Sequence, residues 1–180
     1  MDHQTLRSLI RTVPDWPKPG IRFYDICSII EHPAAFAWTV EQFHSLCRTH
    51  GTQAIVSPDA RGFLWGAPVA LLSGLPLHLA RKPGKLPGQV VTRSYTYEYA
   101  TASISMQAGC FLEGQRVLLL DDVLATGGTA LAIVDLLTAH FKVDPGDILL
   151  AAVLNLKFLP GESLLLKRGV RVETLLNCHE

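Results

Sequence analysis

Residues 117–129, with the sequence VLLLDDVLATGGT, combine side chains suited to binding a phosphorylated sugar. The apolar start predicts a buried strand, and Asp121 and Asp122 follow it directly. A turn of small and hydroxyl residues then precedes a predicted helix, where backbone N–H groups can surround a phosphate at the helix N-terminus. We expect this phosphate turn to be formed by Ala125, Thr126, Gly127, Gly128 and Thr129.

The two carboxylates would stand beside the phosphate, which bare negative charges repel. We therefore expect Asp121 and Asp122 to face hydroxyl groups or a metal-bound sugar, and a ribose 5-phosphate satisfies both halves of the motif. No lysine follows Gly128 as a P-loop requires, and the dinucleotide-binding glycine pattern is also missing. An ordinary strand end followed by an ordinary turn is the alternative.

Cations gather in a second stretch, which is rich in proline and glycine. Arg81, Lys82 and Lys85 bring three positive charges into five positions, an arrangement suited to a polyanion such as pyrophosphate. Arg61 follows a predicted strand, and Gly62 permits close backbone approach, so Arg61 can hold the same polyanion from the other side. The alternatives are a solvated basic loop and a salt bridge at a helix start.

A fold of alternating strands and helices must position these residues. Apolar runs predict strands at 54–57, 77–80, 117–120, 148–154 and 170–175, and helical spacing predicts helices at 1–11, 33–50, 63–72 and 130–140. We interpret the proline-containing segment 13–26 as an ordered loop. Continuously apolar strands favour a parallel sheet covered on both faces, and ligands of such sheets bind beyond the carboxyl ends of the strands.

Composition excludes several classes of protein. Sixteen basic and sixteen acidic residues cancel, so the chain offers no strong field to nucleic acid or to an anionic membrane. The apolar stretches fall short of the roughly 18 residues of a membrane span, and no basic leader precedes an apolar run. The four cysteines lack metal-site spacing, which favours reduced thiols. We expect a cytoplasmic protein of one domain.

The string DDVLATGGT resembles the phosphoribosyl pyrophosphate signature of the type I phosphoribosyltransferases, and is similar to their adenine phosphoribosyltransferase branch. Three further segments match that branch: VPDWPKPGIRFYDI near the start, ARGFLWGAPVAL at 60–71, and RKPGKLPG followed by SYTYEY between 81 and 99. The resemblance implies an α/β fold with an open, twisted parallel sheet. It also implies a base-binding segment at 1–32, a core at 33–180 and a mobile lid loop.

The resemblance further implies that adenine and phosphoribosyl pyrophosphate are the substrates of an enzyme of purine salvage. Mg²⁺ is the implied cofactor, held through substrate and water without direct protein ligands. The ribose would lie on the two aspartates, and the pyrophosphate on Arg61, Arg81, Lys82 and Lys85. Arg61 and Glu98 are the implied catalytic residues, with Glu98 handling the proton of the attacking base. The basic loop reaches the neighbouring subunit's site in this family, which implies a homodimer.

The base pocket is also implied by the resemblance. Phe23 would stack on the purine, Leu124 would lie against its other side, and Arg22 and Tyr24 would flank it. The family usually has Phe-Arg-Asp where this chain has Phe-Tyr-Asp, so a tyrosine replaces an arginine beside the base.

The lid is the segment SYTYEY, in which Tyr95 and Tyr99 would pack over the closed site. A second departure is Ala100, where a glycine normally follows Glu-Tyr. We expect this change to stiffen the lid or to shift its hinge.

Two alternative functions stay open at this point. The tyrosine at position 24 motivates the same reaction on hypoxanthine, guanine or another purine. A non-catalytic sensor of phosphoribosyl pyrophosphate is the other alternative, although regulators of that kind carry a DNA-reading domain or a basic face.

Overall fold

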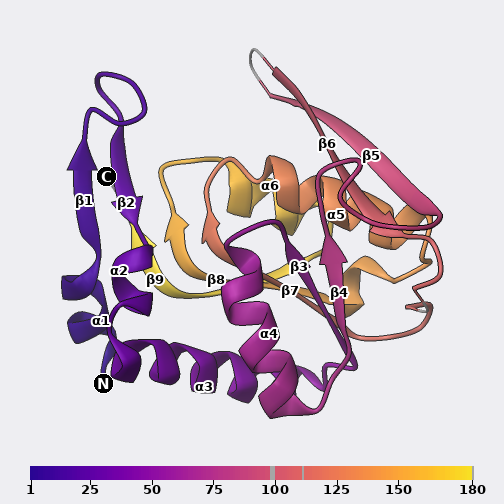
Figure 1. The fold of residues 1–180 in the computed structure, drawn as a ribbon, viewed down its shortest axis with the longest axis horizontal. Helices are drawn as coiled ribbons and strands as arrows, with labels where there is room; N and C mark the ends of the chain where they lie inside the picture. Colours follow the sequence, from indigo (N-terminus) through magenta and orange to yellow (C-terminus); the bar gives the residue numbers. More distant parts are fainter. Residues whose placement is uncertain (98–99, 111, 180) are drawn as a thin grey trace.

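Five parallel strands form the central sheet of the computed structural model, which describes residues 1–97, 100–110 and 112–179. They are ordered β4-β3-β7-β8-β9 across the sheet (Figure 1). In chain order they are β3 (Ala54–Pro58), β4 (Leu77–Ala80), β7 (Val117–Leu124), β8 (Ile148–Leu156) and β9 (Arg171–Cys178). The predicted open parallel sheet is confirmed, and each apolar run noted in the sequence forms one of these strands.

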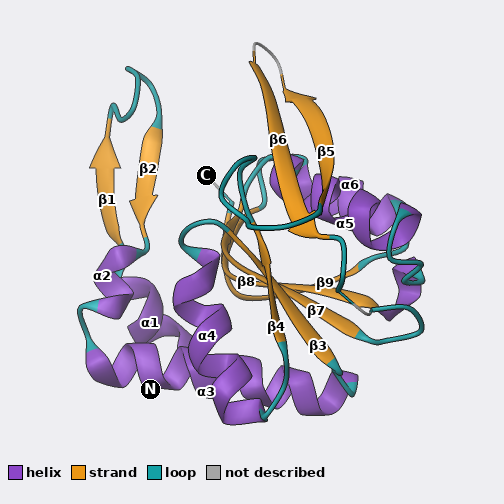
Figure 2. Ribbon diagram, turned by 45° about the vertical axis from the view of Figure 1, so that its right-hand side comes forward, coloured by secondary structure: helices purple, strands orange, loops and turns teal. Residues whose placement is uncertain are grey.

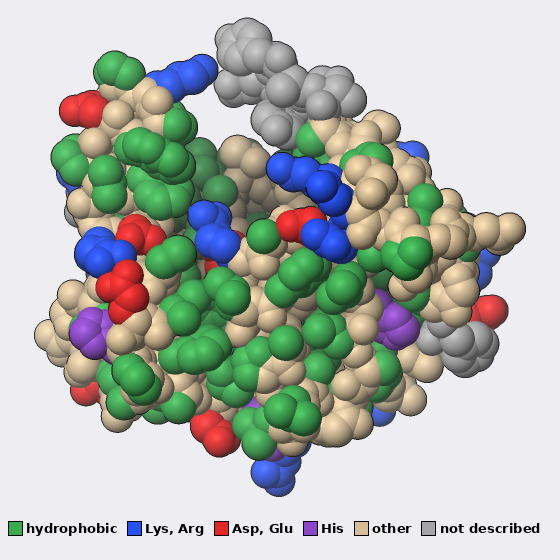
Figure 3. Space-filling view, in the orientation of Figure 1, with side chains coloured by type: hydrophobic (Ala, Val, Ile, Leu, Met, Phe, Trp, Pro, Cys, Tyr) green, Lys and Arg blue, Asp and Glu red, His purple; other side chains and the backbone are tan. Residues whose placement is uncertain are grey.

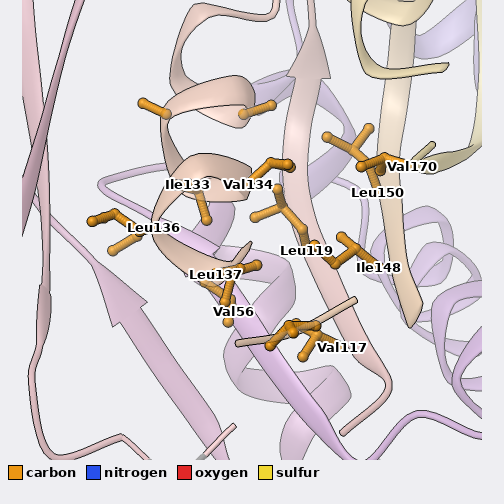
Figure 4. Packing of buried hydrophobic residues seen from close by; sticks show 14 of the residues in the cluster. Val56, Val117, Leu119, Ile133, Val134, Leu136, Leu137, Ile148, Leu150 and Val170 are labelled. Carbon is orange, nitrogen blue, oxygen red and sulfur yellow. The ribbon is translucent and has the colours of Figure 1, made fainter. Parts of the chain in front are cut away.

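Helices cover both faces of the sheet (Figure 2). One face packs against α3 (Pro33–His50) and α4 (Gly62–Ser73), and the other against α5 (Gly128–Ala139) and α6 (Gly161–Lys167). Neighbouring residues of a strand point to opposite faces, so Leu118 packs with α3 and α4 while Leu119 packs beneath α5 (Figure 4). None of the described helices is long and apolar enough to cross a membrane.

The ends and packing of α3 fix the start of α4. Pro33 suits the first turn of α3 because its missing N–H needs no partner there, and Gly51 ends the helix with φ +68°. Trp65 of α4 is buried and donates from Nε1 to Thr39 Oγ1 of α3 at 2.9 Å. The N-terminus of α4, where Arg61 stands, is therefore held at the carboxyl edge of the sheet.

The N-terminal segment contains a hairpin, so the prediction of a loop at 13–26 was wrong. The helix α1 (His3–Leu9) is followed by β1 (Arg11–Pro14), β2 (Arg22–Asp25) and the short helix α2 (Cys27–Ile30), with β1 and β2 antiparallel. Each strand is only four residues long, which is too short for a clear strand pattern, and the proline-rich turn between them is the stronger signal in the sequence. The Arg11 guanidinium pairs with Asp25 and Glu31, each at 2.7 Å, which ties the hairpin to α2.

A second hairpin forms where the sequence predicted a lid loop. The strands β5 (Val90–Tyr97) and β6 (Ala100–Gln107) pair antiparallel and pack against α5 (Figure 1). Arg93 pairs with Asp135 of α5 at 3.0 Å, which fixes the base of the hairpin to the core. Thr92 and Ser94 of β5 face Ser105 and Ser103 of β6 on one side of the hairpin, so the strands do alternate with a period of two, which the prediction of a loop overlooked. The remaining short element is a 3-10 turn (Pro145–Asp147) before β8.

Candidate functional site

Three sequence motifs meet at the carboxyl edge of the sheet, because parallel strands end on the same side. Pro58 of β3 lies opposite Ala80 of β4, so the loops that follow these strands leave the sheet side by side. On its other side β3 pairs with β7, which leads into the predicted phosphate turn. Figure 3 shows basic and acidic side chains grouped along the rim of a hollow between the β1–β2 hairpin and the core.

The sequence predicted that Asp121 and Asp122 follow the strand. In the structure both lie within β7. The strand continues because Val123 and Leu124 pair with Leu154 and Asn155 of β8. The two carboxylates therefore start from opposite faces of the strand. Asp122 is 4% exposed and forms an ion pair with Arg61, whereas Asp121 is half-buried and its Oδ1 accepts from the Asp122 N–H at 2.8 Å.

The Asp121 carboxyl stands in an unfavourable place for a negative charge. Its removal from water, and then the neighbouring Asp122 carboxylate, raise the pKa of Asp121 well above its ordinary value. Gly62 allows this crowding, since a Cβ there would lie 3.1 Å from Asp121 Oδ1 and 2.7 Å from Pro58 Cδ. A cation placed at this carboxyl would relieve the repulsion between the two aspartates.

The phosphate turn encloses a cavity of about 110 Å³, lined by Ala125 to Thr129 together with Asp121 and residues of β7 and β8. Gly127, with φ +82°, precedes the first residue of α5 and supplies no side-chain cap. The first N–H groups of α5 thus lack a partner from a capping side chain, which is the arrangement that binds an anion at a helix N-terminus. Thr129 Oγ1 lies 2.9 Å from Tyr95 Oη of the second hairpin.

Gly161, at the start of α6, supports this turn and was missed in the sequence. Its N–H donates to Ala125 O at 3.1 Å. A Cβ at this position would overlap that same carbonyl oxygen and lie 2.9 Å from the Gly127 nitrogen. The local signal is the Leu-Pro-Gly start of α6, and nothing in it points to Ala125, which lies 36 residues earlier in the chain.

The predicted pyrophosphate residues lie on neighbouring loops. Arg81 donates to Asp59 Oδ2 at 2.9 Å and to the Lys85 carbonyl at 3.1 Å, so it folds the basic loop onto the end of β3. A second cavity, of about 210 Å³, is lined by Asp59, Lys82, Tyr95 and Thr129 among others. The basic loop, the second hairpin and the phosphate turn thus share one cavity, while Lys85 is exposed beside it.

The predicted base residues are only partly brought together. Phe23 is half-buried, with the Trp16 ring centroid at 4.3 Å and the Arg61 guanidinium carbon 6.0 Å from its ring. Leu124 is 3% exposed and packs in the core beneath α5, which leaves little surface for a base.

The remaining predictions concern the flanks and the lid. Arg22 is exposed, and Tyr24 turns to the other face of β2, where its hydroxyl meets Cys178. Glu98 and Tyr99, the predicted catalytic acid and one lid tyrosine, lie outside the described residues.

Replacement Gly161→Ala tests the support of the phosphate turn. The added methyl group overlaps Ala125 O, so the turn must shift, and we expect ribose 5-phosphate to bind at least about 10-fold more weakly. Isothermal titration calorimetry measures this affinity, and circular dichroism checks the fold. The matched control is Gly109→Ala, because, apart from its chain neighbours, no atom of the described residues lies within 4 Å of a Cβ placed there. Unchanged affinity in Gly161→Ala would contradict the role of Gly161.

Replacement Asp121→Asn tests whether the negative charge of Asp121 destabilises the folded protein. Because the pKa of Asp121 is raised in the folded state, the native protein binds more protons, and its free energy of unfolding falls as pH rises above the unfolded value. We expect the variant without ligand to gain about 1 kcal/mol, or roughly 2–4 °C in Tm, near pH 8, and less toward pH 4. Calorimetry measures this difference, with exposed Glu173→Gln as control. A gain independent of pH would exclude this explanation.

Comparison with known proteins assigns the chain to a family. Residues 35–151 match the model of the phosphoribosyl transferase domain. The chain is 42% identical to the adenine phosphoribosyltransferase of Actinobacillus succinogenes, over 96% of this chain and 94% of that one. Its structure resembles the APRTase from Giardia lamblia complexed with 9-deazaadenine, with a TM-score of 0.92 and 31% identity over 100% and 99% of the two chains. It also resembles the adenine phosphoribosyltransferase of Saccharomyces cerevisiae complexed with an imino-altritol bisphosphate and adenine, with a TM-score of 0.85 and 31% identity over 97% and 98%. The chain therefore belongs to the adenine phosphoribosyltransferase family.

Proposed function

We propose that this protein transfers the 5-phosphoribosyl group of phosphoribosyl pyrophosphate to adenine, giving AMP and pyrophosphate. The observation that carries the proposal is the position of Arg61. This arginine pairs with Asp122 on the sugar side and lies 6.0 Å from the Phe23 ring on the base side. The two reactants would therefore meet beside one fixed guanidinium, as transfer between them requires.

The 5-phosphate of the substrate would bind in the phosphate turn. Backbone N–H groups at the start of α5 and the hydroxyls of Thr126 and Thr129 supply its donors, and the positive end of the helix favours its charge. The contact between Thr129 and Tyr95 would link phosphate binding to the second hairpin. The hairpin would then cover the site and exclude water from the reacting sugar.

The ribose hydroxyls would lie on Asp121 and Asp122, and a magnesium ion held through substrate and water would lie beside the Asp121 carboxyl. Among the described residues no group of three or more His, Cys, Asp or Glu side chains is placed to hold a metal. Mg²⁺ commonly uses one or two carboxylates together with water and substrate phosphate oxygens, and the raised pKa of Asp121 marks a place where a cation lowers the energy. When bound, Mg²⁺ neutralises charge on the pyrophosphate.

The pyrophosphate leaving group would be held by Arg61 and by the basic loop. As its bond to the sugar breaks, negative charge grows on the pyrophosphate, and guanidinium and ammonium groups stabilise that charge. Arg81 would exchange Asp59 for the pyrophosphate, while Lys82 and Lys85 bring further positive charge.

Adenine would stack on Phe23 and meet the backbone groups of β2, which are positioned by pairing with β1. The Tyr24 side chain does not enter the base site, because it leaves the strand on the face away from Phe23. We keep Glu98 as the group that handles the proton of the attacking base.

A steady-state assay tests the function. Purified protein is incubated with phosphoribosyl pyrophosphate and Mg²⁺ and, separately, with adenine, hypoxanthine, guanine or xanthine, and both nucleotide and pyrophosphate are measured. We expect turnover with adenine only. Preference for an oxopurine would overturn the base assignment, and binding of phosphoribosyl pyrophosphate without turnover of any base would indicate a sensor.

We also propose a homodimer in which α4 forms part of the interface. This helix has no charged residue, and Leu64, Leu71 and Leu72 are exposed on it, Leu71 to 86%. A helix that is apolar on all sides is normally covered. Figure 3 shows hydrophobic side chains spread over the face where α4 lies. A second copy of the chain would cover this face, and the implied reach of the basic loop into a neighbouring site needs such a partner.

Replacement Leu71→Glu tests the dimer. A charge in the centre of the apolar face would be buried at the interface, so we expect the native protein to sediment as a dimer and the variant as a monomer at micromolar concentration. Analytical ultracentrifugation measures both. The matched control is Leu166→Glu on α6, where a leucine is 54% exposed on another element. A monomeric native protein, or dissociation by both variants alike, would contradict this interface.

A further inference from the structure

Phe23 and Tyr24 are neighbours on β2 and point to opposite faces of the hairpin. Phe23 pairs with Val13 in the hairpin register and meets Trp16 and Arg61 on the site face. Tyr24 pairs with Thr12 and directs its hydroxyl toward the core, where the Cys178 thiol donates to it at 2.9 Å. Whatever fixes Tyr24 therefore also fixes the direction of the Phe23 ring.

Cys178 is a firm attachment point for this contact. It is the last residue of β9, it is 2% exposed, and its carbonyl accepts from the Lys157 N–H at 2.7 Å. It lies opposite Leu156 of β8 at the carboxyl edge of the sheet, which is the edge that carries the site. The bond between Tyr24 and Cys178 thus fixes β2 relative to the central sheet, which also positions the phosphate turn.

Other contacts of the N-terminal segment with β9 start from α1. His3 bonds to Leu175 O and Arg7 donates to Asn177 O, each at 2.8 Å. These bonds hold α1 against the edge of the sheet, before the hairpin begins. Tyr24 contacts β9 from β2, which also carries Phe23, so this contact acts directly on the hairpin.

A cavity of about 210 Å³ separates the hairpin from β8 and β9 next to Tyr24. Beside this cavity the Tyr24 ring packs against the core cluster, and its hydroxyl interacts with Arg22 as well as with Cys178. The contact with Cys178 is the one that joins β2 to β9, so it bears on the angle of β2. The lining residues include Arg7 and Arg22 and no carboxylate, the others being Ile10, Thr12, Tyr24, Leu154, Leu176, Asn177 and Cys178. An arginine at position 24, as the family pattern has it, would add a third cation without an acidic partner in this lining.

We propose that Tyr24 is a positioning residue that, through Cys178, holds β2 so that the Phe23 ring faces Arg61 and receives the base. The proposal rests on the proposed function, since it assigns a role in binding the purine. Burial, and then the bond with Cys178, raise the pKa of Tyr24, so its hydroxyl stays protonated at neutral pH. Loss of the contact lets β2 tilt and weakens adenine binding, while the sites for phosphate and pyrophosphate on the core stay in place.

The test is a set of variants of the full-length protein: Tyr24→Phe, Cys178→Ala, both together, and Cys178→Ser. We expect the first two to raise KM for adenine about 10-fold and to leave KM for phosphoribosyl pyrophosphate within about 2-fold. Because both remove the bond between Tyr24 and Cys178, the effects should not add, and the double variant should resemble Tyr24→Phe. Cys178→Ser keeps a donor and should restore most of the adenine affinity, whereas Tyr24→Arg should not.

Two controls separate positioning from stability and from the proposed function. Cys47→Ala removes another buried thiol, on α3, and should lower stability without changing KM for adenine. Amide hydrogen exchange of residues 22–25 should quicken in Tyr24→Phe whether or not the protein turns over adenine. Unchanged exchange in Tyr24→Phe, or an equal rise in KM for both substrates, would overturn the proposal. A failure of turnover in the native protein would count against the proposed function alone.

Discussion

Two adjacent carboxylates at the buried end of β7 are the constraint around which the rest of the site is built. Asp122 is tolerated there because Arg61 neutralises it, and Arg61 is in place because α4 is fixed to α3 by Trp65. Asp121 has a glycine, Gly62, where any side chain would collide with it. The repulsion between the two charges is a cost to the folded protein without ligand, and a sugar with its bound cation would remove it.

The strands of the core were predictable because burial on both faces makes them mostly apolar, and β3, β7 and β8 each contain an unbroken apolar run in the sequence. The two hairpins were not predicted, since β1 and β2 are only four residues long, and β5 and β6 alternate polar with apolar residues around a segment interpreted as a lid loop. Thr92, Ser94, Ser103 and Ser105 line one face of the second hairpin. The turn that precedes α5 was predicted from its own composition, and its binding of phosphate stays a prediction. Gly161 and the contact of Tyr24 with Cys178 join residues far apart in the chain, and no local pattern encodes them.

Position 24 shows how a departure from a family pattern can be absorbed. Tyr24 leaves β2 on the face away from Phe23, so the change at position 24 puts no new side chain into the base site, and its influence on Phe23 passes through the position of the strand. The tyrosine hydroxyl contacts Cys178 at the end of β9, 154 residues away in the chain. An arginine at position 24 would find no carboxylate among the residues that line this cavity. The tyrosine at position 24 therefore acts on how the β1–β2 hairpin is attached to the core.

The ion pair between Arg81 and Asp59 would affect product release as well as substrate binding. A guanidinium that waits unpaired for a highly charged anion would hold that anion tightly after the bond to the sugar has broken. In the proposed reaction Asp59, 2.9 Å from Arg81, would compete for the guanidinium and pair with it again as the anion leaves. The protein would thereby give up some affinity for the intact substrate and release the product faster, which suits an enzyme that must turn over repeatedly.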